Sequence, residues 1–177
     1  GADSHAFWAH YGYRHLRALG ASDALARELG PQLHEHMRAN YKPVDRVPDD
    51  VLPTLERLKA ENYTLGLVTN RDQPIHDLLP KWGLNGQFDF YFAAGEIGAW
   101  KPDPEIFHYA LGLAHARPDQ AVYVGDNFFA DIRGAQRAGV TPILIDPAGI
   151  WEGYAECTII ETIGELPGVL KNGVGSS

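Results

Sequence analysis

Val122-Tyr-Val-Gly-Asp-Asn-Phe-Phe-Ala-Asp131 is the segment that says most about this chain. It begins with a short apolar run of the kind found in buried parallel strands, so we predict a strand over 121–124. Asp126 follows that strand, and Asp131 lies at the start of a predicted helix over 130–138 that ends at Gly139. Ligands of open parallel sheets bind beyond the carboxyl ends of the strands. Both carboxylates are therefore expected at a binding rim.

Two carboxylates in this arrangement can bind Mg²⁺, a hard cation that prefers oxygen ligands. The alternative is structural: Asp126 or Asn127 caps the following helix, and Asp131 is favourable near the helix N-terminus. Asn127 is expected to cap in either case. We prefer Asp126 and Asp131 as metal ligands.

Two further segments bring polar groups to the same rim. Thr69 and Asn70 follow a predicted strand over 63–68, and the Thr69 hydroxyl can donate to a phosphoryl oxygen, although such residues also form ordinary turns. Lys101 precedes Pro102 and Pro104, which hold it at a rigid bend before a helix that starts at Pro104. Its ammonium can offset negative charge, or it is a solvated loop lysine.

A hydroxyl, an ammonium and two carboxylates suit a phosphate beside a divalent metal. Thr69 and Lys101 are the candidate catalytic residues, and both are expected to bind substrate together with Asn70. Since neighbouring strands lie about 4.8 Å apart, we expect the side chains of Thr69, Lys101 and Asp126 within about 10 Å of one another.

The rest of the chain alternates helices and strands. Helices are predicted to start near Val51 and Pro74, and further strands lie at 88–93, 141–145 and, more weakly, 157–160. This alternation predicts an α/β fold, a doubly wound parallel sheet covered on both faces.

The N-terminal residues 4–41 are predicted to be helical. Ser4 and Ser22 are candidate N-caps, and Pro31 is expected to restart the second helix. The predicted domains are a helical piece at 1–46, the α/β core at 47–167 and a flexible tail at 168–177.

Composition narrows the function classes. The chain has 177 residues, 45% hydrophobic and 21% charged, with a net charge of -8. Such a charge disfavours nucleic acid, and no apolar run approaches the roughly 18 residues that span a bilayer. The single cysteine, Cys157, fits a reducing cytoplasm. The histidines lack the i, i+4 spacing of a helical zinc site, and no glycine-rich dinucleotide or Walker motif is present.

Four segments together resemble the haloacid dehalogenase-like (HAD) hydrolases. They are Val51-Leu-Pro-Thr-Leu-Glu-Arg-Leu58, Leu67-Val-Thr-Asn70, Lys101-Pro-Asp-Pro-Glu-Ile-Phe107, and Val124-Gly-Asp-Asn-Phe-Phe-Ala-Asp-Ile-Arg-Gly-Ala135 with Gly139. The resemblance implies a HAD-like Rossmannoid core, and residues 4–41 look like part of the helical cap of the phosphoglycolate phosphatase-like subgroup. By resemblance, Thr69 binds the phosphoryl group, Lys101 bridges nucleophile and phosphate, and Asp126 is the Mg²⁺ ligand. Asp131 is its acidic companion, which either binds the metal as well or lies directly behind the ligands.

The chain departs from the family at one place. Family members start with a strand ending in Asp-x-Asp, whose first carboxylate attacks phosphorus and whose second is the general acid and base. No such strand is found here, so the chain resembles a member that starts inside its cap. In the family this strand lies between those ending in Thr69 and Asp126. Three outcomes are then possible: these two strands pair directly, the slot stays open, or a neighbouring chain inserts a strand. We favour the inserted strand, as in a strand-swapped homodimer.

Three functions follow as hypotheses. The first is a phosphatase that hydrolyses a small phosphorylated metabolite with Mg²⁺ through an aspartyl-phosphate in the intact protein, the 177-residue chain being inactive. The second is a non-catalytic binding or assembly protein with this fold. A weaker third is a haloacid dehalogenase, which attacks carbon without Mg²⁺. Because few ligands are present, Mg²⁺ should bind at millimolar concentration or more weakly, and Asp72 or Asp103 would be the first candidates for a third acid.

Overall fold

The computed structural model describes residues 10–40 apart from positions 11, 15 and 18, and then residues 46–151 and 157–173. The chain divides into two compact units, Gly1–Asp45 and Arg46–Ser177. The division lies one residue before the predicted boundary. Ser4, a predicted helix cap, lies outside the described residues.

The N-terminal unit contains helix α2, Asp23–Asn40. The Ser22 hydroxyl accepts a hydrogen bond from the Leu25 amide at 3.3 Å, so its predicted capping role is confirmed. The expected restart at Pro31 is wrong, because the proline lies inside one continuous helix. Asp23 accepts hydrogen bonds from Tyr13 and from Arg27, which joins the start of α2 to the preceding helical turns.

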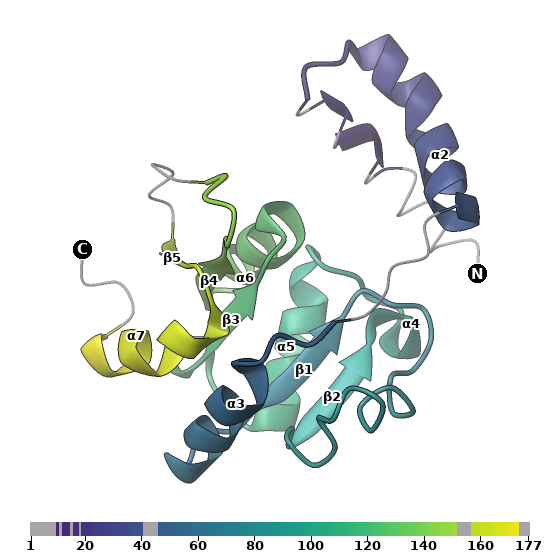
Figure 1. The fold of residues 1–177 in the computed structure, drawn as a ribbon. Helices are drawn as coiled ribbons and strands as arrows, with labels where there is room; N and C mark the ends of the chain where they lie inside the picture. The colour runs from purple at the N-terminus through teal and green to yellow at the C-terminus, as the bar shows by residue number, and fades with distance from the viewer. Residues whose placement is uncertain are drawn as a thin grey trace. The chain divides into compact units, whose positions relative to one another are not determined.

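The C-terminal unit alternates helices and strands (Figure 1). Its elements are α3 (Val51–Ala60), β1 (Gly66–Thr69), β2 (Phe90–Ala93), α4 (Ala94–Ile97), α5 (Pro104–Ala114), η1 (Pro118–Gln120), β3 (Val122–Gly125), the π-helix η2 (Phe128–Ile132), α6 (Arg133–Arg137), β4 (Thr141–Ile145), β5 (Thr158–Ile160), η3 (Ile163–Glu165) and α7 (Leu166–Asn172).

All strand pairs are parallel, in agreement with the predicted α/β class. Within the described residues the strands form two sheets, one of order β1-β2 and one of order β3-β4-β5. Direct pairing of the strands that end in Thr69 and Gly125 is therefore not observed. One edge of β1 and one edge of β3 have no strand partner in the described part of the chain.

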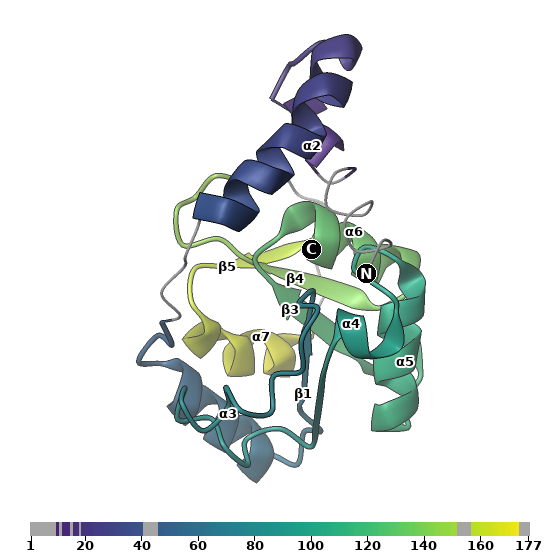
Figure 2. The ribbon, with the colours of Figure 1, turned by 90° about the vertical axis from the view of Figure 1, so that its right-hand side faces the viewer.

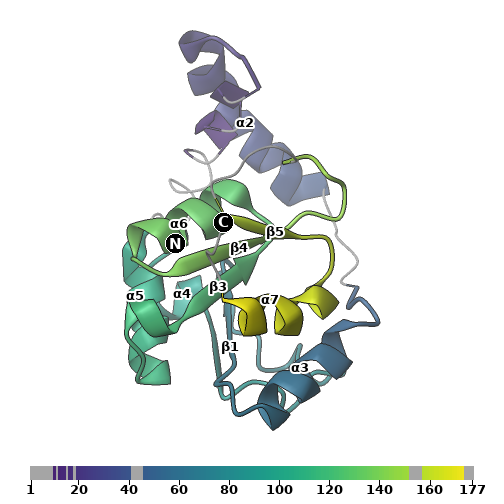
Figure 3. The same ribbon diagram turned by 90° about the vertical axis from the view of Figure 1, so that its left-hand side faces the viewer.

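Helices cover both faces of these strands (Figures 2 and 3). On one face, α5 and α6 pack on β2 and β3 through a cluster that includes Phe92, Ile106, Phe107 and Ala135. On the other, α3 and α7 pack on β4 and β5 through Leu58, Ile143, Ile160 and Leu166. Because both faces of the strands are buried, their sequences are nearly continuous runs of apolar residues.

Two predicted elements differ from the structure. The segment after Pro74 forms turns instead of a helix, although Ile75 and Leu79 are buried. A helix is disfavoured here because Pro80 lacks an amide donor and Gly83 adopts a left-handed φ of 71°. The predicted tail at 168–177 is wrong for residues 168–172, which belong to α7. Leu166, Val169 and Leu170 share one face of α7 and pack into the core.

The predicted helix at 130–138 starts earlier and in another form. A π-helical turn spans Phe128–Ile132, and α6 continues from it. Gly139 ends the segment with φ of 74°, as its predicted role at the helix end requires.

Candidate active site

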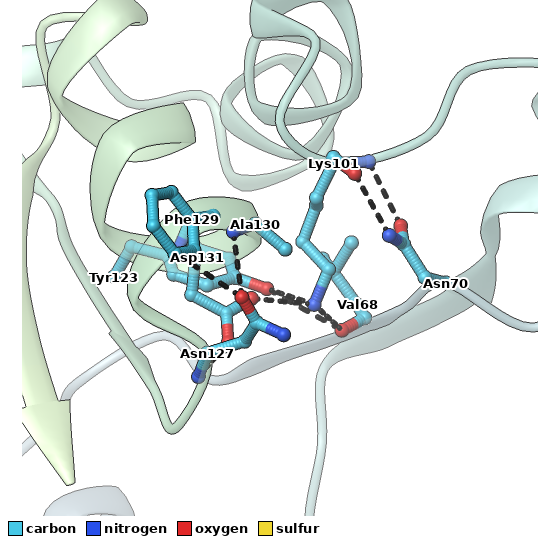
Figure 4. Close-up of polar contacts among 8 residues, drawn as sticks. All are labelled: Val68, Asn70, Lys101, Tyr123, Asn127, Phe129, Ala130 and Asp131. Atoms are coloured by element: carbon cyan, nitrogen blue, oxygen red, sulfur yellow. Dashed lines mark hydrogen bonds and ion pairs between the residues drawn. The ribbon is translucent and has the colours of Figure 1, made fainter. Parts of the chain in front are cut away.

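The backbone of Lys101 is held by hydrogen bonds with the side chain of Asn70, the residue that follows β1. The Asn70 side chain donates to the Lys101 carbonyl at 2.9 Å and accepts from the Lys101 amide at 2.8 Å (Figure 4). Beyond the lysine, the Asp103 carboxylate caps α5 by accepting from the Glu105 amide, and Pro104 occupies the first turn as predicted. The loop is therefore fixed at both ends.

The ammonium of Lys101 meets three oxygens. Its Nζ lies 2.8 Å from Asp131 Oδ1, 3.0 Å from the Tyr123 hydroxyl and 3.4 Å from the Val68 carbonyl oxygen (Figure 4). The side chains of Lys101 and Asp131 are only 11% and 4% exposed. Lys101 is thus a buried, paired residue at the carboxyl ends of β1 and β3, and the alternative of a solvated loop lysine is wrong.

Opposing effects act on the pKa of Lys101. Burial lowers it, but the surrounding Tyr123 hydroxyl and Asp131 carboxylate outweigh burial and raise the pKa above its ordinary value. Burial also raises the pKa of Tyr123 to about 12, so this phenol is neutral at pH 7 and acts as a dipole. The charge that holds the ammonium is therefore that of Asp131.

Asp131 is turned back against the end of β3. Its Oδ2 accepts from the Asn127 amide at 2.9 Å, while Asn127 Oδ1 accepts from the amides of Phe129 and Ala130, so the capping role of Asn127 is confirmed. A Cβ on Gly125 would lie 2.4 Å from Asp131 Cγ, so only glycine permits this approach.

Thr69 and Asp126 form the open part of the rim. Asp126 is exposed and Thr69 is half-buried. Among the described residues, no hydrogen-bond or ion-pair partner is observed for either side chain. The charge of Asp126 contributes to the raised pKa of Tyr123, so Asp126 acts on the same cluster. The predicted 10 Å convergence of Thr69, Lys101 and Asp126 stays a prediction.

The two acids fit a metal ion to different degrees. Asp126 is open to a cation. Asp131 Oδ1 is buried with no hydrogen bond of good geometry and so retains acceptor capacity, but the Lys101 ammonium already faces it. No group of three metal-ligating side chains is found among the described residues. The described donors therefore supply an incomplete Mg²⁺ site, with Asp126 as its more available ligand.

Sequence reasoning missed Tyr123 and Gly125. Tyr123 carries the only side-chain hydroxyl in an apolar strand, and that exception to the pattern is the signal that could have found it. Gly125 is required because the Asp131 carboxylate packs against its backbone, and no local sequence pattern shows this contact.

Comparison with known proteins identifies a family whose matched region includes these residues. The family model described as haloacid dehalogenase-like hydrolase matches residues 15–145. The chain belongs to this family. The match covers α3 through β4 and therefore every residue of the candidate site. The predicted HAD family is thereby confirmed.

Several named proteins are similar to this chain. A glyceraldehyde 3-phosphate phosphatase of Methanopyrus kandleri is 35% identical over 76% of the chain and 60% of its own length. Among solved structures, a HAD phosphatase from Thermococcus onnurineus has a TM-score of 0.68 at 28% identity, covering 96% of this chain and 91% of that one. A 2-haloacid dehalogenase from Pseudomonas syringae pv. Tomato DC3000 has a TM-score of 0.65 at 31% identity, covering 95% and 71%.

The chain spans only about three-fifths of the length of the curated relatives that it matches first, 57% to 60%. None of the helices in the described ranges is long and apolar enough to cross a bilayer.

Proposed function

We propose that this HAD-like chain is the larger part of a Mg²⁺-dependent phosphatase that acts on a small phosphomonoester, in the cytoplasm. The observation that carries the proposal is the buried ion pair of Lys101 and Asp131. It is held where β1 and β3 each present an edge that no strand of the described residues pairs with. Phosphatases among the similar proteins support it.

Each residue has a distinct part in the proposed reaction. The Lys101 ammonium compensates negative charge between an attacking carboxylate and the phosphoryl group. The Thr69 hydroxyl, for which no partner is observed among the described residues, donates to a phosphoryl oxygen, and Asn70 holds the Lys101 backbone in place. Asp126 would bind Mg²⁺, which when bound neutralises charge on the phosphoryl oxygens.

The attacking carboxylate is proposed to lie outside these 177 residues. It would displace the substrate's alcohol from phosphorus to give an aspartyl-phosphate, while a second acid protonates the leaving oxygen and then helps water to release phosphate. A strand between β1 and β3 would place both acids beside Lys101. We propose that it comes from an upstream segment of the protein or from a second copy in a strand-swapped dimer.

The test compares two proteins with p-nitrophenyl phosphate and Mg²⁺. The 177-residue chain should be inactive, and the protein expressed from the complete reading frame should turn over and lose that activity with Asp126→Ala. Turnover by the 177-residue chain that Asp126→Ala abolishes would show that another residue attacks.

The similarity to a 2-haloacid dehalogenase supports a second candidate on the same fold. Such an enzyme releases halide from a carbon atom, and the exposed Asp126 has no evident use in it. Halide release without Mg²⁺ by the complete protein would favour this candidate. Absence of both activities would favour the non-catalytic alternative.

A further inference from the structure

Tyr123 links the two strands that flank the site. Its hydroxyl accepts from Lys101 Nζ at 3.0 Å and donates to the Val68 carbonyl on β1 at 3.4 Å (Figure 4). Its ring lies edge-on to Phe107 at 4.7 Å between centroids, and Lys101 Nζ lies 5.4 Å from the ring centre. One side chain of β3 thus contacts both the lysine and β1.

The three N–H donors of Lys101 face three oxygen atoms, one of them through an ion pair and two through hydrogen bonds. A lysine ammonium has three N–H donors, and Lys101 faces three acceptors: Asp131 at 2.8 Å, Tyr123 at 3.0 Å and Val68 at 3.4 Å. The contact with Val68 is longer than an ordinary hydrogen bond and is the weakest of the three. It is the partner that an incoming oxygen can replace at least cost.

Packing alone does not explain why position 123 carries a hydroxyl group. A phenylalanine would keep the contact with Phe107 and avoid burying a polar group, which is costly unless it is hydrogen-bonded. The partners of this hydroxyl are the candidate catalytic lysine at 3.0 Å and, at the longer distance of 3.4 Å, the Val68 carbonyl of the neighbouring strand.

We propose that Tyr123 is a positioning residue for Lys101: together with Asp131 it holds the ammonium in place, and the N–H now shared with the Val68 carbonyl is the one that a phosphoryl oxygen takes. This inference rests on the proposed phosphatase function. Tyr123 contacts no substrate in it and acts through the lysine.

Tyr123→Phe in the protein expressed from the complete reading frame tests the inference. We expect about a tenfold loss of kcat, the size expected for one hydrogen bond to a charged group, with a melting temperature close to wild type. The affinity for inorganic phosphate, measured by calorimetry, should fall several-fold. Tyr109→Phe is the matched control, because Tyr109 is 45% exposed and its ring packs on Phe92, and it should change neither quantity.

A double-mutant cycle with Lys101→Met separates positioning from a general structural role. If Tyr123 acts through Lys101, Tyr123→Phe should cause almost no further loss of kcat in the Lys101→Met protein. An equal loss in both backgrounds, or wild-type kcat and phosphate affinity in Tyr123→Phe, would overturn the inference.

The cycle also distinguishes this inference from the proposed function. If the complete protein hydrolyses no phosphomonoester, the proposed function fails. Phosphate affinity that falls with Tyr123→Phe only when Lys101 is present would still support positioning, and affinity that does not change would overturn it.

Discussion

The buried and the open halves of the candidate site are held in opposite ways. In the buried half, Lys101 contacts both Tyr123 and Asp131, and these side chains are largely shielded from water. In the open half, Thr69 and Asp126 have no polar partner among the described residues. The buried half therefore contributes to folding as well as to the proposed chemistry, whereas the side chains of the open half are accessible to a ligand. Substitutions should separate these two contributions.

The largest expected effect on stability is that of Asp131→Asn. It leaves the Lys101 ammonium buried without a countercharge, and breaking one partner of a buried ion pair costs about 3–5 kcal/mol. Urea denaturation of the 177-residue chain measures the loss. A loss below about 1 kcal/mol would mean that Lys101 finds water or another acid.

Gly125→Ala should cost less, about 1–3 kcal/mol, because its Cβ would meet Asp131 Cγ at 2.4 Å and force the carboxylate away from Lys101. The matched control is Gly168→Ala in α7, where an added Cβ meets nothing within 4 Å. That control should be neutral or slightly stabilising. Equal unfolding midpoints for the two variants would refute the close approach at Gly125.

High pH should weaken the buried half gradually. The raised pKa of Lys101 means that its contribution is complete below the ordinary lysine value of about 10.4 and is lost as pH rises through the higher folded value. The pKa of Tyr123, raised to about 12 by burial, acts in the same direction, since the unfolded phenol loses its proton first. Stability should fall from about pH 10 to 12, and Tyr123→Phe should flatten that fall while Tyr109→Phe should not.

The smallest expected effect on stability belongs to the open half. Asp126→Asn should change the free energy of unfolding by less than about 0.5 kcal/mol, because the side chain is exposed and has no polar partner in the described part of the chain. It should nevertheless weaken the binding of Mg²⁺, which we expect near millimolar concentration in the wild-type chain. Calorimetry that finds micromolar affinity would indicate a third acid, and Asp72 is then the first suspect, because Asp103 already caps α5.

Local patterns in the sequence were enough to predict most of the strands. The strand predicted at 141–145 matches β4, and those at 88–93 and 121–124 match β2 and β3 to within two residues at each end. Apolar runs between turn signals are unambiguous where both faces of a sheet are covered. The same reasoning failed after Pro74 and at α7, because prolines and glycines in short amphipathic segments leave packing to decide the outcome.

By itself, the sequence determined the alternation of helices and strands, the parallel class of the sheet, the family and the polar residues at the strand ends. Each of these depends on neighbours within a few positions. Only the tertiary structure decided that the Lys101 side chain is buried, that it forms an ion pair with Asp131, and that it donates a hydrogen bond to the Tyr123 hydroxyl. These contacts connect residues 22 to 55 positions apart, so they exist only once β1, β3 and the Lys101 loop have packed together.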